Sequence, residues 1–105
     1  MREQRPVIRK AVHFIYKGDE IVSLVKAAHQ LPPFRLELGL SRLRIDYYSM
    51  VSRDWLYGFN FTRAPGLNAW SLDEIEYDLS TTLRRALSQL GELEECGLRK
   101  IKYGH

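Results

Sequence analysis

The side chains best suited to chemistry are three histidines and one cysteine: His13, His29, His105 and Cys96. None of the histidines stands at a metal-ligand spacing from another His, Cys or carboxylate, and a single cysteine cannot build a thiolate zinc site. Cys96 follows two glutamates, whose negative charges disfavour a reactive thiolate. The sequence therefore predicts no metal site and no cofactor, and it offers no activated nucleophile.

Acid–base chemistry has little support in the sequence. His13 stands in the middle of an apolar stretch, so we expect a buried, hydrogen-bonded side chain there. Asp46 and Asp54 are the best candidates for an acid–base pair, but carboxylates in strands and turns are usually solvated. No G-x-S-x-G turn or glycine-rich phosphate loop occurs. The sequence thus favours a protein that is not an enzyme.

Charge is distributed unevenly along the chain, whose net charge is +3. Residues 1–17 carry five basic groups and one acid, residues 97–105 carry three basic groups and no acid, and residues 71–96 carry seven acids. One candidate function is therefore nucleic-acid binding by the basic ends. The residues that would bind it are Arg9, Lys10, Arg99, Lys100 and Lys102.

Length and composition predict one domain over residues 1–105. The chain has 105 residues, of which 45% are hydrophobic and 28% charged, enough for one ordinary core. The first residues do not resemble a signal peptide, and no apolar run approaches the ~20 residues of a membrane span. With one cysteine, we expect a cytoplasmic protein that does not enter the membrane.

The first third of the sequence predicts a strand and then a helix. Hydrophobic residues occupy both faces of residues 6–17 at period two, which is typical of an interior strand. After Gly18, apolar residues recur at spacings of three and four from Glu20 to Leu31, with Asp19 as the expected N-cap. Two prolines then end the helix.

Three antiparallel strands are predicted between Phe34 and Thr62, because large residues alternate with polar or small ones. In the last of these strands, Trp55 and Tyr57 share the face expected to pack on the helices, and Leu56 takes the opposite face. A turn at residues 52–54 separates this strand from the one before it.

A second helix is predicted to begin at Ser71. Residues 71–74 read Ser-Leu-Asp-Glu, which fits a capping box, and Trp70 and Ile75 stand where a hydrophobic staple would place them. The apolar spacing continues to Leu90, so the helix is expected to end at Gly91 or to extend to Cys96. The sequence leaves open a short final strand over residues 98–103.

These elements predict an α+β fold in the order β-α-β-β-β-α-(β). The expected architecture is an antiparallel sheet of four or five strands with both helices on one face. Helix, three strands and helix over residues 19–90 are similar in order to the double-stranded-RNA-binding domain. That family binds RNA through basic residues at the start of its last helix, where this sequence has Ser71, Asp73 and Glu74. We therefore assign no family.

Two helices can cover only one face of such a sheet, so the other face is the predicted contact surface. It is expected to carry a mixture of charged and apolar residues, namely Arg44, Asp46, Tyr48, Met50 and Leu56. The sequence thus favours a small non-catalytic binding module that acts through protein–protein contacts and forms a homodimer. The alternatives are the nucleic-acid-associated protein described above, and a small-molecule-binding protein or enzyme with a pocket between helices and sheet.

Overall fold

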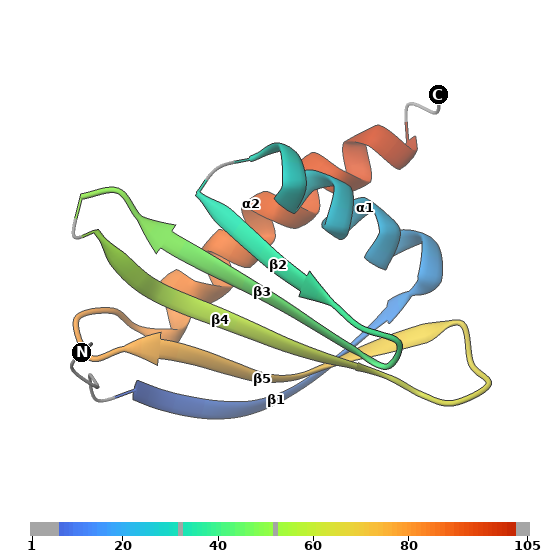
Figure 1. The fold of residues 1–105 in the computed structure, drawn as a ribbon, viewed down its shortest axis with the longest axis horizontal. Coiled ribbons are helices and arrows are strands. Elements are labelled where there is room, and N and C mark those ends of the chain that lie inside the picture. The colour runs from blue at the N-terminus through green and yellow to red at the C-terminus, as the bar shows by residue number, and fades with distance from the viewer. Residues whose placement is uncertain (1–6, 32, 52, 103–105) are drawn as a thin grey trace.

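Five antiparallel strands and two helices make up the chain in the computed structural model, which describes residues 7–31, 33–51 and 53–102, without the side chains of 98–102. The elements are β1 (Val7–Lys17), α1 (Gly18–Gln30), β2 (Phe34–Leu38), β3 (Arg42–Ser49), β4 (Asp54–Arg63), β5 (Ala69–Asp78) and α2 (Leu83–Lys102). The strands form one sheet in the order β1-β5-β4-β3-β2, so the first strand lies beside the last (Figure 1). The predicted α+β class, antiparallel sheet and two helices are confirmed.

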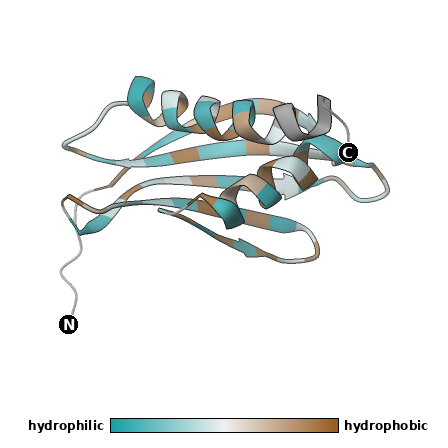
Figure 2. Ribbon diagram, turned by 90° about the horizontal axis from the view of Figure 1, so that it is seen from above, coloured by the Kyte–Doolittle hydropathy of each residue, from teal (hydrophilic) through white to brown (hydrophobic). Residues whose placement is uncertain are grey.

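One hydrophobic core joins the two helices to one face of the sheet, because alternate residues of each strand point toward the helices. Figure 2 shows this alternation as brown and teal bands along the strands. The strands contribute fully buried side chains, among them Leu43, Ile45, Phe59, Phe61, Leu72 and Ile75. The helices contribute Leu24, Ala27, Ala86, Leu90 and Leu93. We call the opposite, helix-free side of the sheet the outer face.

Helix α1 forms where the apolar spacing predicts it, but it begins two residues earlier. The helix starts at Gly18, and the N-cap is Lys17, not the predicted Asp19. The backbone N–H of Lys17 donates to Glu20 Oε1 at 2.7 Å, which satisfies a donor at this end of the helix. The helix ends at Gln30, just before the two prolines.

The three strands predicted between Phe34 and Thr62 are present as β2, β3 and β4, with one irregularity that changes the faces. Tyr47 pairs with Tyr57, but Tyr48 pairs with Trp55, which leaves Leu56 as the extra residue of a β-bulge. The bulge puts Trp55 on the outer face beside Tyr48, whereas Leu56 packs against the core. The predicted faces of Trp55 and Leu56 were therefore wrong.

The prediction of a helix starting at Ser71 is also wrong, because residues 69–78 form strand β5 between β1 and β4. The Ser71 hydroxyl donates to Asp73 Oδ1 at 2.7 Å, and Trp70 is a buried strand residue. Asn60 pairs with Glu74 and Phe61 with Leu72, so Asp73 lies in a bulge. The bulge lets Leu72 and Ile75 both face the core at a spacing of three, which imitates the spacing of a helix.

Helix α2 begins at Leu83, where Thr82 closes its first turn. The Thr82 carbonyl accepts from the Ala86 N–H at 3.1 Å, and its hydroxyl accepts from the Arg85 N–H at 3.2 Å. The helix continues through Gly91 to Lys102, so the predicted final strand is wrong for residues 98–102, and Tyr103 lies outside the described residues. Neither helix in the described part of the chain is both long and apolar enough to cross a membrane.

Strand β1 lies at the edge of the sheet and not in its interior, because its one pairing within the described residues is with β5. His13, expected to be buried, is exposed, and its Nδ1 lies 3.4 Å from the hydroxyl of Ser71. Only some of the apolar residues that suggested an interior strand are buried. Tyr16 is buried, but Phe14 and Ile15 remain exposed.

Candidate functional site

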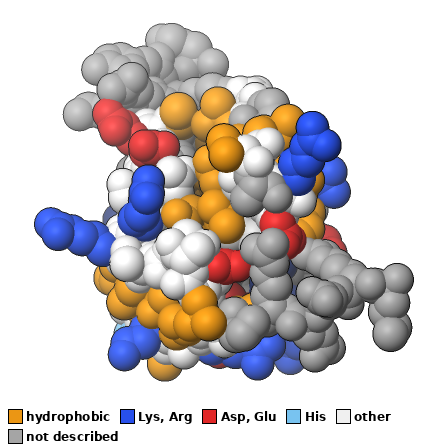
Figure 3. All heavy atoms as spheres, turned by 90° about the vertical axis from the view of Figure 1, so that its left-hand side faces the viewer, with side chains coloured by type: hydrophobic (Ala, Val, Ile, Leu, Met, Phe, Trp, Pro, Cys, Tyr) orange, Lys and Arg blue, Asp and Glu red, His pale blue; other side chains and the backbone are white. Residues whose placement is uncertain are grey.

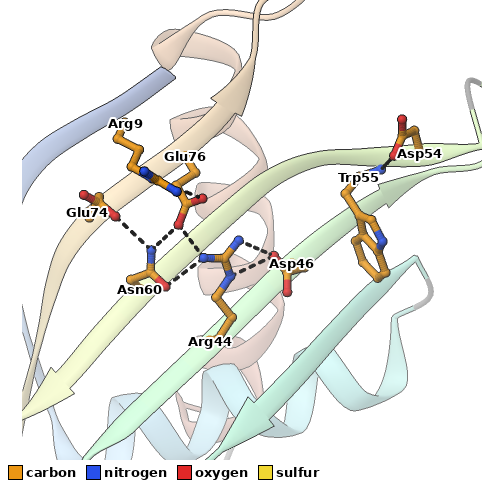
Figure 4. Close-up of polar contacts among 8 residues, drawn as sticks. All are labelled: Arg9, Arg44, Asp46, Asp54, Trp55, Asn60, Glu74 and Glu76. Carbon is orange, nitrogen blue, oxygen red and sulfur yellow. Dashed lines mark hydrogen bonds and ion pairs between the residues drawn. The ribbon is translucent and has the colours of Figure 1, made fainter. Parts of the chain in front are cut away.

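The outer face of the sheet carries a hydrogen-bonded group of charged residues centred on Arg44. Its Nε and Nη2 each lie 2.9 Å from Asp46 Oδ1, and its Nη1 donates to Asn60 Oδ1 at 3.0 Å and to the Glu76 carboxylate. The Asn60 amide donates in turn to Glu76 at 2.7 Å and to Glu74 at 3.3 Å. Figure 4 shows these side chains rising from the three central strands.

A glycine makes room for the Arg44 guanidinium. Asp46 pairs with Gly58 across β3 and β4, so a side chain at position 58 would point outward beside Arg44. A Cβ there would lie 2.2 Å from Arg44 Nη2, far inside contact distance. Because Gly58 has no side chain, the guanidinium can lie flat across β4 and reach Glu76 on β5.

Glu76 is the carboxylate that this arrangement stabilises most clearly. Burial alone would raise its pKa, but hydrogen bonds from Asn60 and Arg44 and the charges of Arg44 and Arg9 lower the pKa below its ordinary value. Arg9, on the edge strand, adds an ion pair with Glu76 at 3.7 Å. Burial lowers the pKa of Arg44, but the hydrogen bonds and charges of Asp46 and Glu76 raise it above its ordinary value. Arg44 therefore stays charged.

We predict that Glu76→Gln lowers the free energy of unfolding at pH 7 by about 1–2 kcal/mol, because charge-assisted hydrogen bonds to Arg44 become neutral ones. Because the pKa of Glu76 is lowered in the folded state, its charge stabilises the fold at pH values above the ordinary pKa of a glutamate, about 4.3. This stabilisation is lost as the pH falls through the pKa of the folded state. Urea unfolding measured from pH 7 to pH 3 should therefore show that the free energy of unfolding decreases less in Glu76→Gln than in the parent.

The control for this prediction is Glu92→Gln, at an exposed position on α2. This variant should have the same free energy of unfolding at pH 7 as the parent and the same decrease in it between pH 7 and pH 3. If the free energy of unfolding decreased equally in Glu76→Gln and the parent between pH 7 and pH 3, the Arg44 group would not stabilise the charged form of Glu76.

An aromatic and arginine cluster occupies the outer face next to the Arg44 group. The rings of Tyr48 and Trp55 meet edge to face with centroids 5.1 Å apart. The Arg35 guanidinium lies 5.1 Å from the Trp55 ring centroid and 5.9 Å from that of Tyr48, within cation–π range. The bulge at Leu56 creates this cluster, because it turns Trp55 outward. We call these three residues the Arg35 cluster.

The outer face is hollowed into an open groove of about 870 Å³, which extends from the Arg44 group toward the turn between β2 and β3. Its lining is mostly charged and includes Arg9, Glu37, Arg42, Arg44, Asp73, Glu74 and Glu76. The groove is thus a wide polar surface of both charge signs, unlike the enclosed apolar pocket typical of a small-molecule site.

His13, Ser71 and Asp73 come together beside this groove, but not in the order of a catalytic triad. The Ser71 hydroxyl donates to Asp73, so its proton is not directed at His13, and the carboxylate orients the serine instead of the histidine. Asp73 also accepts from the hydroxyl of Thr62. Across residues 7–31, 33–51 and 53–97, no three His, Cys, Asp or Glu side chains gather closely enough to hold a metal.

A second polar cluster lies between the helices and β1. The Tyr16 hydroxyl donates to Glu94, and burial raises the pKa of both groups, with the Glu20 charge adding to the effect. These residues line a cavity of about 10 Å³ together with Ser23 and Leu24. The cavity has room for about one water molecule, which is too little for a substrate or cofactor.

The outer face brings together three of the five predicted contact residues: Arg44, Asp46 and Tyr48. Met50 lies beyond the strand, in the turn between β3 and β4, where it is exposed, and Leu56 turns toward the core. Tyr48 and Met50 lie toward the same end of the outer face, and Arg44 lies nearer its middle. The sequence missed Arg35, Trp55, Asn60 and Glu76.

The residues predicted to bind nucleic acid are dispersed. Arg9 and Lys10 lie on β1, whereas the backbone of residues 99–102 belongs to α2. The side chains of Arg99, Lys100 and Lys102 lie outside the described residues. Nucleic-acid binding stays a prediction.

Comparison with known proteins adds no functional information. The sequence matches no protein-family model, and no curated protein is significantly similar to it.

Proposed function

We propose that this chain is a small non-catalytic protein-binding module that self-associates through the outer face of its sheet. The observation that carries the proposal is the Arg35 cluster, which presents an arginine, a tyrosine and a tryptophan together on a face that no helix covers. These are the three residue types that most often dominate the energy of protein interfaces.

Apolar surface continues past the cluster into the turn between β3 and β4. Met50 is 72% exposed and Val51 is 97% exposed, and both follow Tyr48 closely in the chain. Figure 3 shows hydrophobic side chains at this end of the molecule with Lys and Arg side chains beside them. A partially apolar patch with polar groups at its border is the usual anatomy of an interface.

A second copy of the chain is the proposed partner because the outer face is unlike at its two ends. Arg35 and the exposed Arg53 lie toward one end, whereas Asp73 and Glu74 line the groove toward the other. Two copies related by a two-fold axis across this face would each place Arg35 and Arg53 near Asp73 and Glu74 of the other copy. The Arg44 group would lie near the centre, with its charges already satisfied within each copy.

The test is light scattering over a range of protein concentrations on the parent and on the double variant Tyr48→Glu, Met50→Lys. We expect the parent to have the mass of a dimer and the double variant to be monomeric, because losing one anchor typically costs ~2 kcal/mol or more, about a thirtyfold weaker dimer. Circular dichroism should be the same for both proteins.

The matched control is Val22→Lys, which changes a residue that is 52% exposed on α1, on the side of the sheet opposite the outer face. This variant should remain dimeric. A parent that stays monomeric at high concentration, or a dimer that the double variant leaves intact, would refute the proposal.

A further inference from the structure

The sheet has two edges, and they differ in length and cover. At one edge, β2 is five residues long and contacts α1. At the other edge, β1 is eleven residues long, and eight of those residues are exposed. Figure 1 shows β1 as the lower border of the sheet. A long edge strand is a template for another strand, since its outward N–H and C=O groups lack partners in the sheet.

The edge of β1 is basic. Residues 7–17 include Arg9, Lys10, His13 and Lys17 and contain no acidic residue. Glu76 on the neighbouring strand contacts Arg9, so part of that charge is offset. Lys10 pairs in register with Ile75, and β5 therefore supplies no carboxylate opposite it.

The part of β1 best shaped to accept a strand is its first half. Pairing with β5 is regular from Val7 to Ala11 and shifts between Ala11 and Phe14, so the bulge limits a straight edge to five residues. Within that stretch, Arg9 shares the outer face with Glu76, and Lys10 points to the opposite side. A strand added here would meet a basic side chain on each of its faces.

We propose that the edge of β1 binds an extended acidic segment of another protein, which adds to the sheet as a sixth strand beside Val7–Ala11. Backbone hydrogen bonds would supply the pairing, and two adjacent carboxylates on the segment would meet Arg9 and Lys10, one on each face. This edge is separate from the Arg35 cluster, and the inference does not depend on self-association.

The same charges argue against a second copy at this edge. Two β1 strands laid side by side would bring two sets of basic side chains together without an acid from either strand. Lys and Arg on edge strands are a common means of preventing such self-pairing. An acidic segment gains from the charges that keep two copies of β1 apart.

The test uses a fluorescently labelled hexapeptide with the sequence threonine, valine, glutamate, glutamate, valine, threonine, and fluorescence anisotropy at low salt as the readout. We expect the peptide to bind the full-length protein. The same peptide with lysines in place of the glutamates should not bind. A peptide with methylated backbone nitrogens at alternate residues should also lose binding, because it cannot form a ladder of hydrogen bonds.

Two charge reversals locate the site on the protein. Lys10→Glu should weaken binding of the acidic peptide about tenfold or more, equivalent to ~1.4 kcal/mol or more. Lys26→Glu, at an exposed position on α1, should leave it unchanged. The Tyr48→Glu, Met50→Lys variant should bind the peptide as the parent does, which separates this edge from the proposed dimer contact.

Four results would overturn the inference. The first is no binding of the acidic peptide, and the second is binding that Lys10→Glu does not weaken. The third is binding that survives backbone methylation, since charge attraction without strand pairing would explain it. Binding of duplex DNA in place of the peptide would also count against it.

Discussion

Replacing Glu74 by proline is expected to lower the free energy of unfolding by about 3 kcal/mol or more, enough to prevent folding in a marginally stable domain. Glu74 lies in the middle of β5, paired with Ala11 on one side and Asn60 on the other. Proline cannot donate to a sheet ladder and is excluded from strands that have neighbours on both sides. Urea unfolding of Glu74→Pro beside Glu74→Ala isolates the backbone effect from the loss of the carboxylate.

Leu83→Pro provides the opposite case. Leu83 is the first residue of α2, where proline fits because its N–H has no partner within the helix. Leu83→Pro should therefore be about as stable as Leu83→Ala. If a helix ran from residue 72 instead, proline would be tolerated at Glu74 and would break the helix at Leu83. A strand at residue 74 and a helix at residue 74 therefore predict opposite effects of proline at both Glu74 and Leu83.

The second large effect concerns the crossing of the two helices at Gly97. A Cβ at this position would lie 2.8 Å from the carbonyl oxygen and 2.9 Å from the carbonyl carbon of Ser23 on α1, so the two atoms nearest to it are backbone. We expect Gly97→Ala to destabilise the protein by about 1–3 kcal/mol, because the helices must move apart. Thermal or urea unfolding measures the change.

Gly91 in the same helix is the matched control. A Cβ there would meet no atom within 4 Å, so the space is open. Gly91→Ala should stabilise the protein by about 0.5–1 kcal/mol, since alanine is the better helix former. If both substitutions stabilise the protein, the close approach of α1 and α2 at Gly97 is wrong.

Much of the fold could be predicted from the sequence because local pattern and tertiary environment agree in those segments. Helix α1 shows its apolar spacing between a glycine and two prolines, and β2, β3 and the part of β4 after its bulge alternate regularly around Leu43, Ile45 and Phe59. These segments each bury one face, so their periodicity reports their structure directly.

Residues 69–78 were misassigned because a bulge disguised a strand. With Asp73 as an extra residue, Leu72 and Ile75 face the core together, at the spacing of neighbouring residues on a helix. The serine and glutamate of the apparent capping box have other roles. Ser71 donates to Asp73, and Glu74 accepts from Asn60 across the sheet. Local sequence carries no direct signal for pairing with strands far away in the chain.

The candidate site was only partly predictable for the same reason. Arg44 and Asp46 could be placed together because they alternate on one strand. Glu76 joins them only when residue 76 is in a strand beside β4, and Trp55 reaches Tyr48 only through the bulge at Leu56. A glycine at position 58, within an aromatic strand, was the one local hint that something occupies the space above it.

The pairing of β1 with β5 has a consequence for the order in which the protein is made. Strands β2 to β5 each lie beside the next in sequence and can assemble hairpin by hairpin, but Val7 pairs with Asp78. Contacts across such long separations form late, because closing the intervening loop costs entropy before any contact repays it. During synthesis, β1 emerges first and its neighbour β5 emerges last among the strands. Until β5 has been made, β1 lacks its partner, so the first of the five strands in sequence would be the last to join the sheet.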